Sequence, residues 1–498
     1  MTTFILALSI LVTAYFVYGS FVARAFGVDP NRPTPCHTLA DGVDFMPMPT
    51  WKVFLIQFLN IAGTGPIFGA ILGILYGPAA YLWIVLGCVF GGAVHDYLSG
   101  MISIRKEGAS LPEIVGDELG TTARQGMRVL SLVLMILVGT VFAQTPASLL
   151  GNMTSGWALW GDGNPVYIWT AIIICYYILA TLLPIDKLIG RIYPLFGMAL
   201  LIMAGGVFVG LLFSEGNLPE ITEAFHSHHP TANATPIFPG LCITIACGAV
   251  SGFHATQSPM MARCITNERL GQRVFYGAMI AEGIVALIWA AAAISFADAL
   301  DVKGNTPYEK LLAAMTNPAT GTANPAVIVN KICHDWLGGV GAVLAILGVV
   351  AAPLTSGDTA LRSARLITAD FMKIKQDKIL KRLALCLPIF ALSVGLMFID
   401  FSVIWRYFAW TNQSLSVFTF WALTVWLARK GRCYWITLLP AAFMTMVCTS
   451  YILVAPEGLQ WSAMAGNSIG LGAALTLTAL FFLWKGKGGG RKADTPKI

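Results

Sequence analysis

The sequence predicts an all-α polytopic membrane protein of about 13 transmembrane helices, and three observations support this. Hydrophobic residues make up 56% of the 498 residues and charged residues only 11%, whereas a soluble domain uses about 25% charged residues. Apolar runs of about 20 residues, enough to cross roughly 30 Å of hydrocarbon as a helix, recur along the chain. Basic residues gather in alternate connections between these runs. The expected spans are 4–22, 51–77, 80–103, 126–147, 165–183, 192–213, 236–256, 273–298, 337–361, 380–398, 405–428, 433–453 and 466–485.

The basic residues also predict the orientation of the chain. If the 13 spans alternate, 27 of the 31 Lys and Arg residues fall on one side of the membrane. Because cytoplasmic connections carry the excess of Lys and Arg, we expect an outside N-terminus and a cytoplasmic C-terminus in the plasma membrane, the inner membrane of a bacterial cell. The net charge of +6 then reflects topology and not nucleic-acid binding. The basic residues left on the outer side are Lys303, Lys310, Lys331 and Arg406.

The span 51–77 contains a segment that a continuous helix does not tolerate. Residues 61–77 read IAGTGPIFGAILGILYG, in which Pro66 cannot donate to the helix ladder and the glycines before it do not resist unwinding. Unpaired backbone at membrane depth is tolerated only where it lines a cavity or lies within protein. A glycine at every fourth position from Gly65 to Gly77 supports a second interpretation, a stripe for close helix packing. The residues expected to contact a substrate here are Gly63, Thr64 and Gly65.

A second interruption lies in the span 236–256, at a similar depth. By the distribution of basic residues, the five spans within 51–215 and the five within 236–428 have opposite topology, and each set begins with an interrupted span. Interrupted helices in matching positions of inverted halves are typical of transporter binding sites. We therefore expect a small carboxylate or peptide to bind between 63–66 and 248–254. The residues expected to contact it in the second span are Gly248, Ser251, Gly252, Phe253 and His254.

This arrangement divides the chain into four parts. An extra N-terminal helix and loop (1–50) precede the first repeat (51–215). Two C-terminal helices with a basic tail (429–498) follow the second repeat (236–428).

The outer connection 299–336 is predicted to be either a gate or an ordered surface hairpin. Thr306, Pro307 and Glu309 match an N-cap, a proline at the first helical position and a capping-box acid. Residues 324–325 begin a second short helix. In the preceding outer loop, 214–235, the residues that are either solvated or metal-binding are His226, His228 and His229.

Hydroxyl and ionisable side chains inside spans are candidates for cation coupling. Thr355 and Ser356 would either hold Na⁺ together with carbonyls of a broken helix or bond back to their own helix. Asp96, with His95 before it, is an acid within a span, and such burial indicates either a proton relay or gate or a structural role. His254 is either a proton carrier or substrate ligand, or a satisfied core histidine. The expected coupling ion is H⁺ or Na⁺.

Other polar residues within spans are expected to line the pathway or to hold helices together. Asn412 and Gln413 lie mid-helix, where their amides need partners. Glu282 is a second acid within a span, and Asp358 precedes Arg362 by four residues, the spacing of a helical ion pair. The ten cysteines show no paired pattern, so we expect no disulfide and no metal beyond a possible Na⁺.

Five segments carry a specific combination of motifs: IAGTGPIFGAILG (61–73), GGAVHDYLSGMISIRKEGASLPEIVG (91–116), GAVSGFHATQSP (248–259), TSGDTALRSARLITAD (355–370) and WRYFAWTNQSLS (405–416). In this order, over residues 51–440, they resemble the carbon starvation protein (CstA) family. The resemblance implies a transporter of pyruvate or peptides with the LeuT-like 5+5 inverted-repeat fold of the APC superfamily. It also implies that 51–77 and 236–256 are the two broken helices, and that Thr355 and Ser356 match a sodium site of several relatives.

Together these features predict a secondary active importer that works by alternating access and couples a small carboxylate or peptide, pyruvate or short peptides, to H⁺ or Na⁺. Its partners would be this small molecule and the lipid bilayer, with no cofactor other than the coupling ion. The sequence contains no nucleophile–base triad, phosphate-binding loop or HExxH motif, so we do not expect an enzyme. The alternative is a channel or a transporter-like nutrient sensor without coupled flux.

Overall fold

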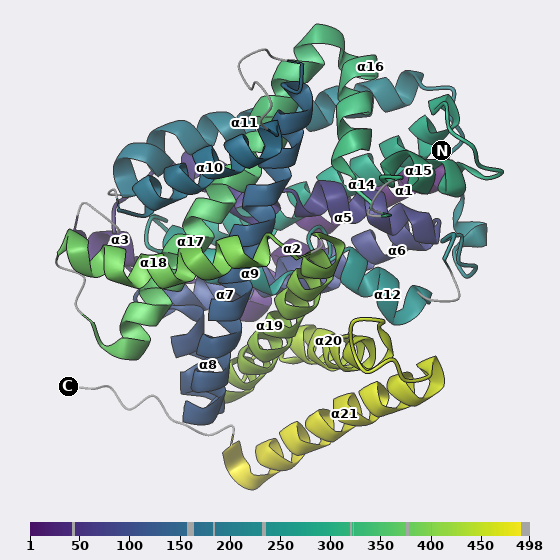
Figure 1. The fold of residues 1–498 in the computed structure, drawn as a ribbon. Coiled ribbons are helices and arrows are strands. Elements are labelled where there is room, and N and C mark those ends of the chain that lie inside the picture. Colours follow the sequence, from purple (N-terminus) through teal and green to yellow (C-terminus); the bar gives the residue numbers. More distant parts are fainter. Residues whose placement is uncertain are drawn as a thin grey trace.

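The computed structural model describes residues 1–41, 45–156, 164–182, 185–231, 236–318, 321, 323–374, 378–399 and 401–489. Within these residues the regular elements are helices, gathered into one bundle (Figure 1), and an isolated bridge joins Thr316 to Ala323. The α-helices are α1 (Thr2–Phe16), α2 (Tyr18–Phe26), α3 (Pro35–Thr38), α4 (Thr50–Ala62), α5 (Gly65–Gly73), α6 (Ala79–Leu86), α7 (Ala93–Arg105), α8 (Leu111–Leu119), α9 (Thr121–Met153), α10 (Pro165–Leu182), α11 (Ile185–Phe213), α12 (Ile237–Thr244), α13 (Gly252–Ala262), α14 (Gly277–Phe296), α15 (Pro307–Met315), α16 (Ala326–Ala345), α17 (Ala351–Met372), α18 (Ile379–Leu396), α19 (Phe401–Arg429), α20 (Trp435–Val454) and α21 (Ala463–Trp484).

The described helices make this a multi-pass membrane protein with fewer recognisable spans than the sequence predicts. Eight are long and apolar enough to cross a membrane, and the bent pair α4 and α5 would make a ninth. Of the four predicted spans that fall short, 165–183 forms an apolar helix of only Pro165–Thr181. The other three are 236–256, 337–361 and 405–428. They are not recognised as spans among the described residues: the first is divided at 245–251, the second begins at a bend at Gly338, and the third carries polar side chains such as Asn412 and Gln413. The count of 13 therefore remains a prediction.

Burial separates the central helices from the peripheral ones. Nearly all of the span that contains α14 is buried, whereas α18 and α21 expose most of their surface. In Figure 1, α21 lies along the edge of the bundle beside α20, with which it packs. Its exposed side chains include Leu475 and Leu483. Large exposed apolar surfaces of this kind mark membrane contact.

The first predicted interruption is confirmed. Helix α4 ends at Ala62 and α5 begins at Gly65, and the two are bent by 45°. Gly63 has φ +48° and ψ −140°, a backbone conformation that side chains disfavour. Pro66 lies in the first turn of α5, where its missing N–H has no helical partner to lose.

The predicted glycine stripe packs against the second interrupted span at Gly65, Gly69 and Gly73, whereas Gly77 lies beyond α5 and faces His228. A Cβ atom on Gly65 would lie 2.3 Å from Cys247 Cβ, and one on Gly73 would lie 2.3 Å from Ile245 Cγ1. These contacts leave no room for a larger residue. Break and packing stripe are therefore two parts of one contact between the broken helices.

The second interruption lies slightly earlier in the chain than predicted. Helix α12 ends at Thr244, and α13 begins at Gly252 after the non-helical residues 245–251. The sequence places Phe253 and His254 within the break, whereas the structure places them in the first turn of α13. The reason is a cap from another helix, because the side chain of Asn412 accepts a hydrogen bond from Phe253 N (2.7 Å) and starts α13 there.

The outer connection contains the helix that its capping motif predicts. Thr306 accepts a hydrogen bond from Glu309 N and caps α15. The second helix, α16, begins at Ala326, bends at Gly338 and continues through the π-helical segment η8 (Ile346–Val350) into α17. The basic end of the predicted tail, residues 490–498, lies outside the described residues.

Candidate substrate and cation site

Four ionisable side chains from three helices form a chain in the centre of the bundle. Asp96 on α7 contacts His95 Nδ1 through one carboxylate oxygen (2.9 Å) and His254 Nδ1 through the other (2.8 Å). His254 Nε2 lies 3.4 Å from Glu282 on α14. All four side chains are fully buried. The sequence singles out each of these residues, and the structure brings them together.

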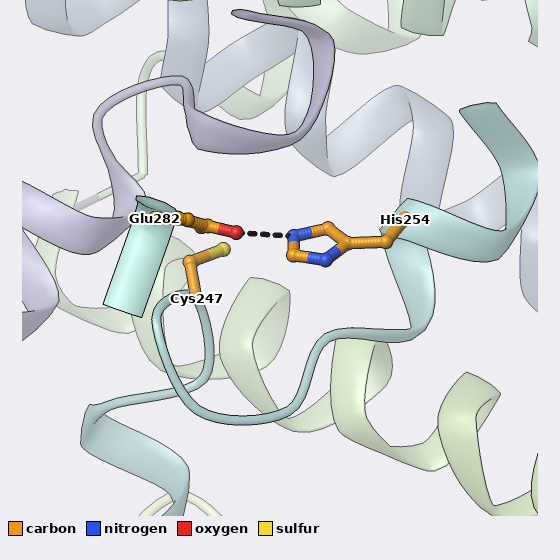
Figure 2. A group of neighbouring side chains, drawn as sticks. All are labelled: Cys247, His254 and Glu282. Carbon is orange, nitrogen blue, oxygen red and sulfur yellow. Dashed lines mark ion pairs between the residues drawn. The ribbon is translucent and has the colours of Figure 1, made fainter. Parts of the chain in front are cut away.

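The end of this chain is shown in Figure 2, where the imidazole of His254 points to the carboxylate of Glu282 and the thiol of Cys247 lies beside both. Their donor atoms lie within 4.8 Å of one another, compact enough for one small cation. The backbone N–H of Gly248 also faces Glu282, yet neither Glu282 oxygen nor His254 Nε2 makes a hydrogen bond of good geometry among the described residues. An acid and an imidazole held this way are suited to share a proton. The spacing of the cysteines in the sequence did not indicate that Cys247 lies beside His254 and Glu282.

Glycines bring α7 close enough for Asp96 to reach α13. A Cβ on Gly92 would lie 2.3 Å from the carbonyl oxygen of Ala249, and one on Gly91 would lie 2.5 Å from Val250 Cγ2. Both glycines belong to the π-helical segment η2 (Gly87–Gly92) just before α7. π-Helical turns are frequent at functional sites. The same backbone approach therefore joins α7 to the second break.

A second oxygen-rich group lies at the end of α4. Ser356 Oγ is 3.1 Å from Leu59 O and 3.3 Å from Asn60 O, just before the first break. Thr355 instead donates to Ala352 O on its own helix (2.8 Å). Of the predicted hydroxyl pair, Ser356 is therefore the one that hydrogen-bonds to the broken helix. A hydroxyl and carbonyls are the neutral oxygens that hard cations accept.

Several polar atoms near this break make no hydrogen bond in the described part of the chain. They include both side-chain polar atoms of Asn60 and the hydroxyl of Thr64. Gln57 on α4 reaches Ser258 on α13 (3.4 Å) through its amide nitrogen, while its oxygen has no partner. Gln57 and Asn60 are not among the residues predicted from the sequence. Their spacing of three residues within an apolar span would have indicated them.

The polar residues of α19 and α17 hold helices together. The Asn412 amide also bonds the Ser251 hydroxyl, and Gln413 donates to Cys242 O on α12. Asp358 accepts a hydrogen bond from Tyr193 (3.1 Å). All of these side chains are buried, so the structure supports packing for Asn412 and Gln413.

The two breaks pack directly against each other, and a cavity lies beside α5 and α12. It has a volume of about 460 Å³ and is lined by α5, α12, the start of α19 and the end of α20. The residues of the predicted substrate site, 63–66 and 248–254, are not among its lining residues. Those that matter for its chemistry are Tyr76, His229, Trp405, Arg406, Tyr451 and Glu457.

The outer histidines are spread over this region. His229 packs on Tyr76 (4.8 Å between ring centroids) at the cavity, whereas His228 stacks on Tyr308 (4.7 Å). Within the described residues, these histidines form no group of potential metal donors.

Comparisons with known proteins support a transporter. The family model for the carbon starvation protein CstA matches residues 1–160 and 162–331. An uncharacterized membrane protein of Haemophilus influenzae is 46% identical over 59% of this chain and 91% of its own length. The peptide transporter CstA of Bacillus subtilis is 30% identical, over 60% of this chain and 59% of its own. The pyruvate/proton symporter BtsT of Escherichia coli is 28% identical, over 70% and 56%.

The matches to the two named transporters cover less than two thirds of their lengths. Both are named as transporters and not as enzymes. Because the family model covers more than half of the chain, this protein belongs to the carbon starvation protein CstA family of membrane transporters.

Proposed function

We propose that this transporter is a secondary active importer of a small carboxylate or short peptide, driven by a cation gradient through alternating access. The observation that carries the proposal is the contact between the two interrupted helices, with Gly65 packed against the second break. That break, residues 245–251, leads into His254, which joins Asp96 and Glu282. A non-helical segment next to buried charges is an arrangement through which ion binding can be coupled to a substrate site.

We propose H⁺ as the first candidate for the coupling ion, held along Asp96, His254 and Glu282. Two carboxylates and two imidazoles share a site away from water, so the number of bound protons sets a net charge that the packing must accommodate. A proton between His254 and Glu282 ties α13 to α14, and its release leaves Glu282 without that link. Besides the four side chains of this chain, the titratable groups that face it are Cys88 and Cys247.

Na⁺ is the second candidate, and the position of Ser356 supports it. Its hydroxyl and the carbonyls of Leu59 and Asn60 converge at the end of α4. Thr355 would take part only after its hydroxyl turns away from Ala352. The name of the pyruvate/proton symporter BtsT, 28% identical to this chain, supports H⁺ over Na⁺.

We further propose the LeuT-like 5+5 inverted repeat with 13 spans, an outside N-terminus and a cytoplasmic C-terminus in the inner membrane. The two breaks at 63–64 and 245–251 support the repeat. The opposite directions of the halves follow from the distribution of basic residues. The cavity beside α5 and α12 would then open toward the outside.

The experiment is uptake by proteoliposomes that contain the purified full-length protein. Labelled pyruvate and labelled dialanine are supplied outside while an H⁺ gradient, a Na⁺ gradient or neither is imposed. We expect accumulation above the external concentration for at least one substrate, and only with a gradient. Equilibration without accumulation under every gradient would indicate a channel, and accumulation with no gradient would rule out coupling to H⁺ or Na⁺.

A further inference from the structure

We propose that the outer cavity is a binding site for a ligand with both an ammonium group and a carboxylate, such as a free amino acid or short peptide. In this site Glu457 binds the ammonium group, while Arg406 and Trp405 bind the carboxylate. The inference rests on the proposed import function and specifies the substrate class within it.

The cavity has the size and position of a capture site. Its volume of about 460 Å³ lies within the range of roughly 300–1,000 Å³ that is usual for small-molecule sites. Pyruvate would fill only a small part of it. The lining residues Ile243 and Thr244 end α12, so a ligand here would lie directly in front of the second break.

The acidic end of the cavity is Glu457, which follows α20. Tyr451 donates a hydrogen bond to one carboxylate oxygen, and Tyr407 donates to the backbone carbonyl (2.9 Å). The side chain is only 6% exposed. Its second oxygen has no hydrogen-bond partner in the described part of the chain. A buried carboxylate oxygen without a donor is costly, and a ligand ammonium group would supply that donor.

The basic end lies beside it on α19. Arg406 Nε is 3.5 Å from Glu457 but forms no hydrogen bond with it, and the side chain is 40% exposed. The indole N–H of Trp405 is buried and has no acceptor among the described residues. Burial lowers the pKa of His229, so this histidine is neutral at pH 7 and adds no positive charge. Two unsatisfied donors next to an unsatisfied acceptor match a ligand that carries both groups.

An ordinary internal ion pair does not account for this geometry. Arg406 and a carboxylate that served only each other would form close paired hydrogen bonds. Here the pair is long, and polar atoms on both partners remain unused. The Tyr451 hydroxyl instead anchors the carboxylate oxygen of Glu457 that faces Arg406.

The test is calorimetric titration of the purified protein in nanodiscs with four probes: dialanine, N-acetyl-dialanine, dialanine amide and pyruvate. We expect dialanine to bind tightest, and each blocked form or pyruvate to bind about 10- to 100-fold more weakly, the equivalent of one lost charge-assisted hydrogen bond. Pyruvate binding as tightly as dialanine would overturn the inference.

Single substitutions test the ammonium-binding end and the carboxylate-binding end of the site separately. Glu457→Gln should weaken dialanine binding and remove the preference over the N-acetyl form. Arg406→Gln, or Trp405→Phe with its ring retained, should remove the preference over the amide. Tyr407→Phe, whose hydroxyl contacts only the backbone of Glu457, is the control and should preserve both preferences. Unchanged preferences in Glu457→Gln would overturn the site.

The binding assay tests the cavity as a ligand site, and the gradient-driven uptake assay tests coupled transport, so either proposal can be ruled out without the other. If the wild type shows gradient-driven uptake, but substitution of Glu457 or Arg406 does not change the preferences among the probes, the cavity is not the ligand site and the transporter proposal still holds. Binding with the expected preferences but no gradient-driven uptake would support the ligand site and contradict coupled transport.

Discussion

The two faces of the bundle around the broken helices are closed in different ways. On the proposed cytoplasmic face, Arg105 pairs with Glu268 through two hydrogen bonds of 3.0 Å. Glu118 there accepts from both Lys106 (3.0 Å) and Arg429 (2.7 Å). The proposed outer face instead has a cavity of about 460 Å³ whose polar atoms are partly unbonded.

If the proposed orientation and alternating access hold, this difference assigns the structure to one half of the transport cycle. Ion pairs connect the ends of α7, α8 and α19 on the proposed cytoplasmic face, while the opposite face leaves room for a ligand. Between the faces, the chain of Asp96, His254 and Glu282 is sealed from both sides. We interpret the structure as a state that receives ligand from outside and keeps the coupling groups shielded.

The largest effect is expected from Asp96→Asn at the sealed centre. The variant removes the charge that pairs with His254, and breaking a buried pair costs about 3–5 kcal/mol. We expect H⁺-driven accumulation in proteoliposomes to fall to the level of empty liposomes. Asp298→Asn, which alters only a surface pair with Lys310, should transport normally.

Substrate exchange without a gradient separates coupling from folding in this variant. Asp96→Asn should retain exchange between internal and external substrate, because the cavity is unchanged. Full H⁺-driven accumulation by Asp96→Asn would show that the buried acid does not carry the coupling ion.

A smaller effect is expected from Gly65→Ala at the contact between the breaks. The new methyl group would lie 2.3 Å from Cys247 Cβ, and overpacking of this kind costs about 1–3 kcal/mol. We expect a lower thermal unfolding temperature and slower uptake. The matched control is Gly126→Ala on α9, where a Cβ meets no atom within 4 Å. Equal unfolding temperatures for Gly65→Ala and the wild type would contradict the direct packing.

Ser356→Ala and Thr355→Ala test the oxygen-rich group at the end of α4. If Na⁺ contributes, Ser356→Ala should raise the Na⁺ concentration for half-maximal uptake by about tenfold, the equivalent of one lost ligand. Thr355→Ala should change it less, because this hydroxyl already bonds Ala352. An equal or larger effect of Thr355→Ala would contradict the geometry.

The smallest effect is expected from Glu118→Gln on the inner face. Partly exposed ion pairs contribute about 1 kcal/mol, so hydrogen exchange of α8 amides should rise by about fivefold. The control is Asp117→Asn, whose carboxylate is more exposed in the same helix (48% against 6%). A similar rise in both variants would remove the special role of Glu118 in closing this face.

The sequence predicted local features well because local chemistry determines them. Gly63 and Pro66 mark the first break wherever the helix lies, and Thr306 and Glu309 cap α15 without help from the rest of the fold. The exact start of α13 could not be predicted in this way, since it depends on Asn412 from a helix far along the chain.

The site depended on contacts that no short motif reveals. Asp96, His254 and Glu282 are each visible as ionisable residues within spans, but only the packing of α7, α13 and α14 joins them. Glu457 lies in a short loop without a motif, and its importance arises from the cavity alone. The sequence placed the substrate at the breaks, whereas the structure places open volume in front of them.

Coupling to H⁺ is measured most directly as substrate-induced H⁺ movement into proteoliposomes loaded with a pH-sensitive dye. Adding dialanine outside, with no imposed gradient, should acidify the lumen in the wild type and leave it unchanged in Asp96→Asn. Uptake of dialanine by the wild type without any acidification would contradict H⁺ coupling through the buried chain.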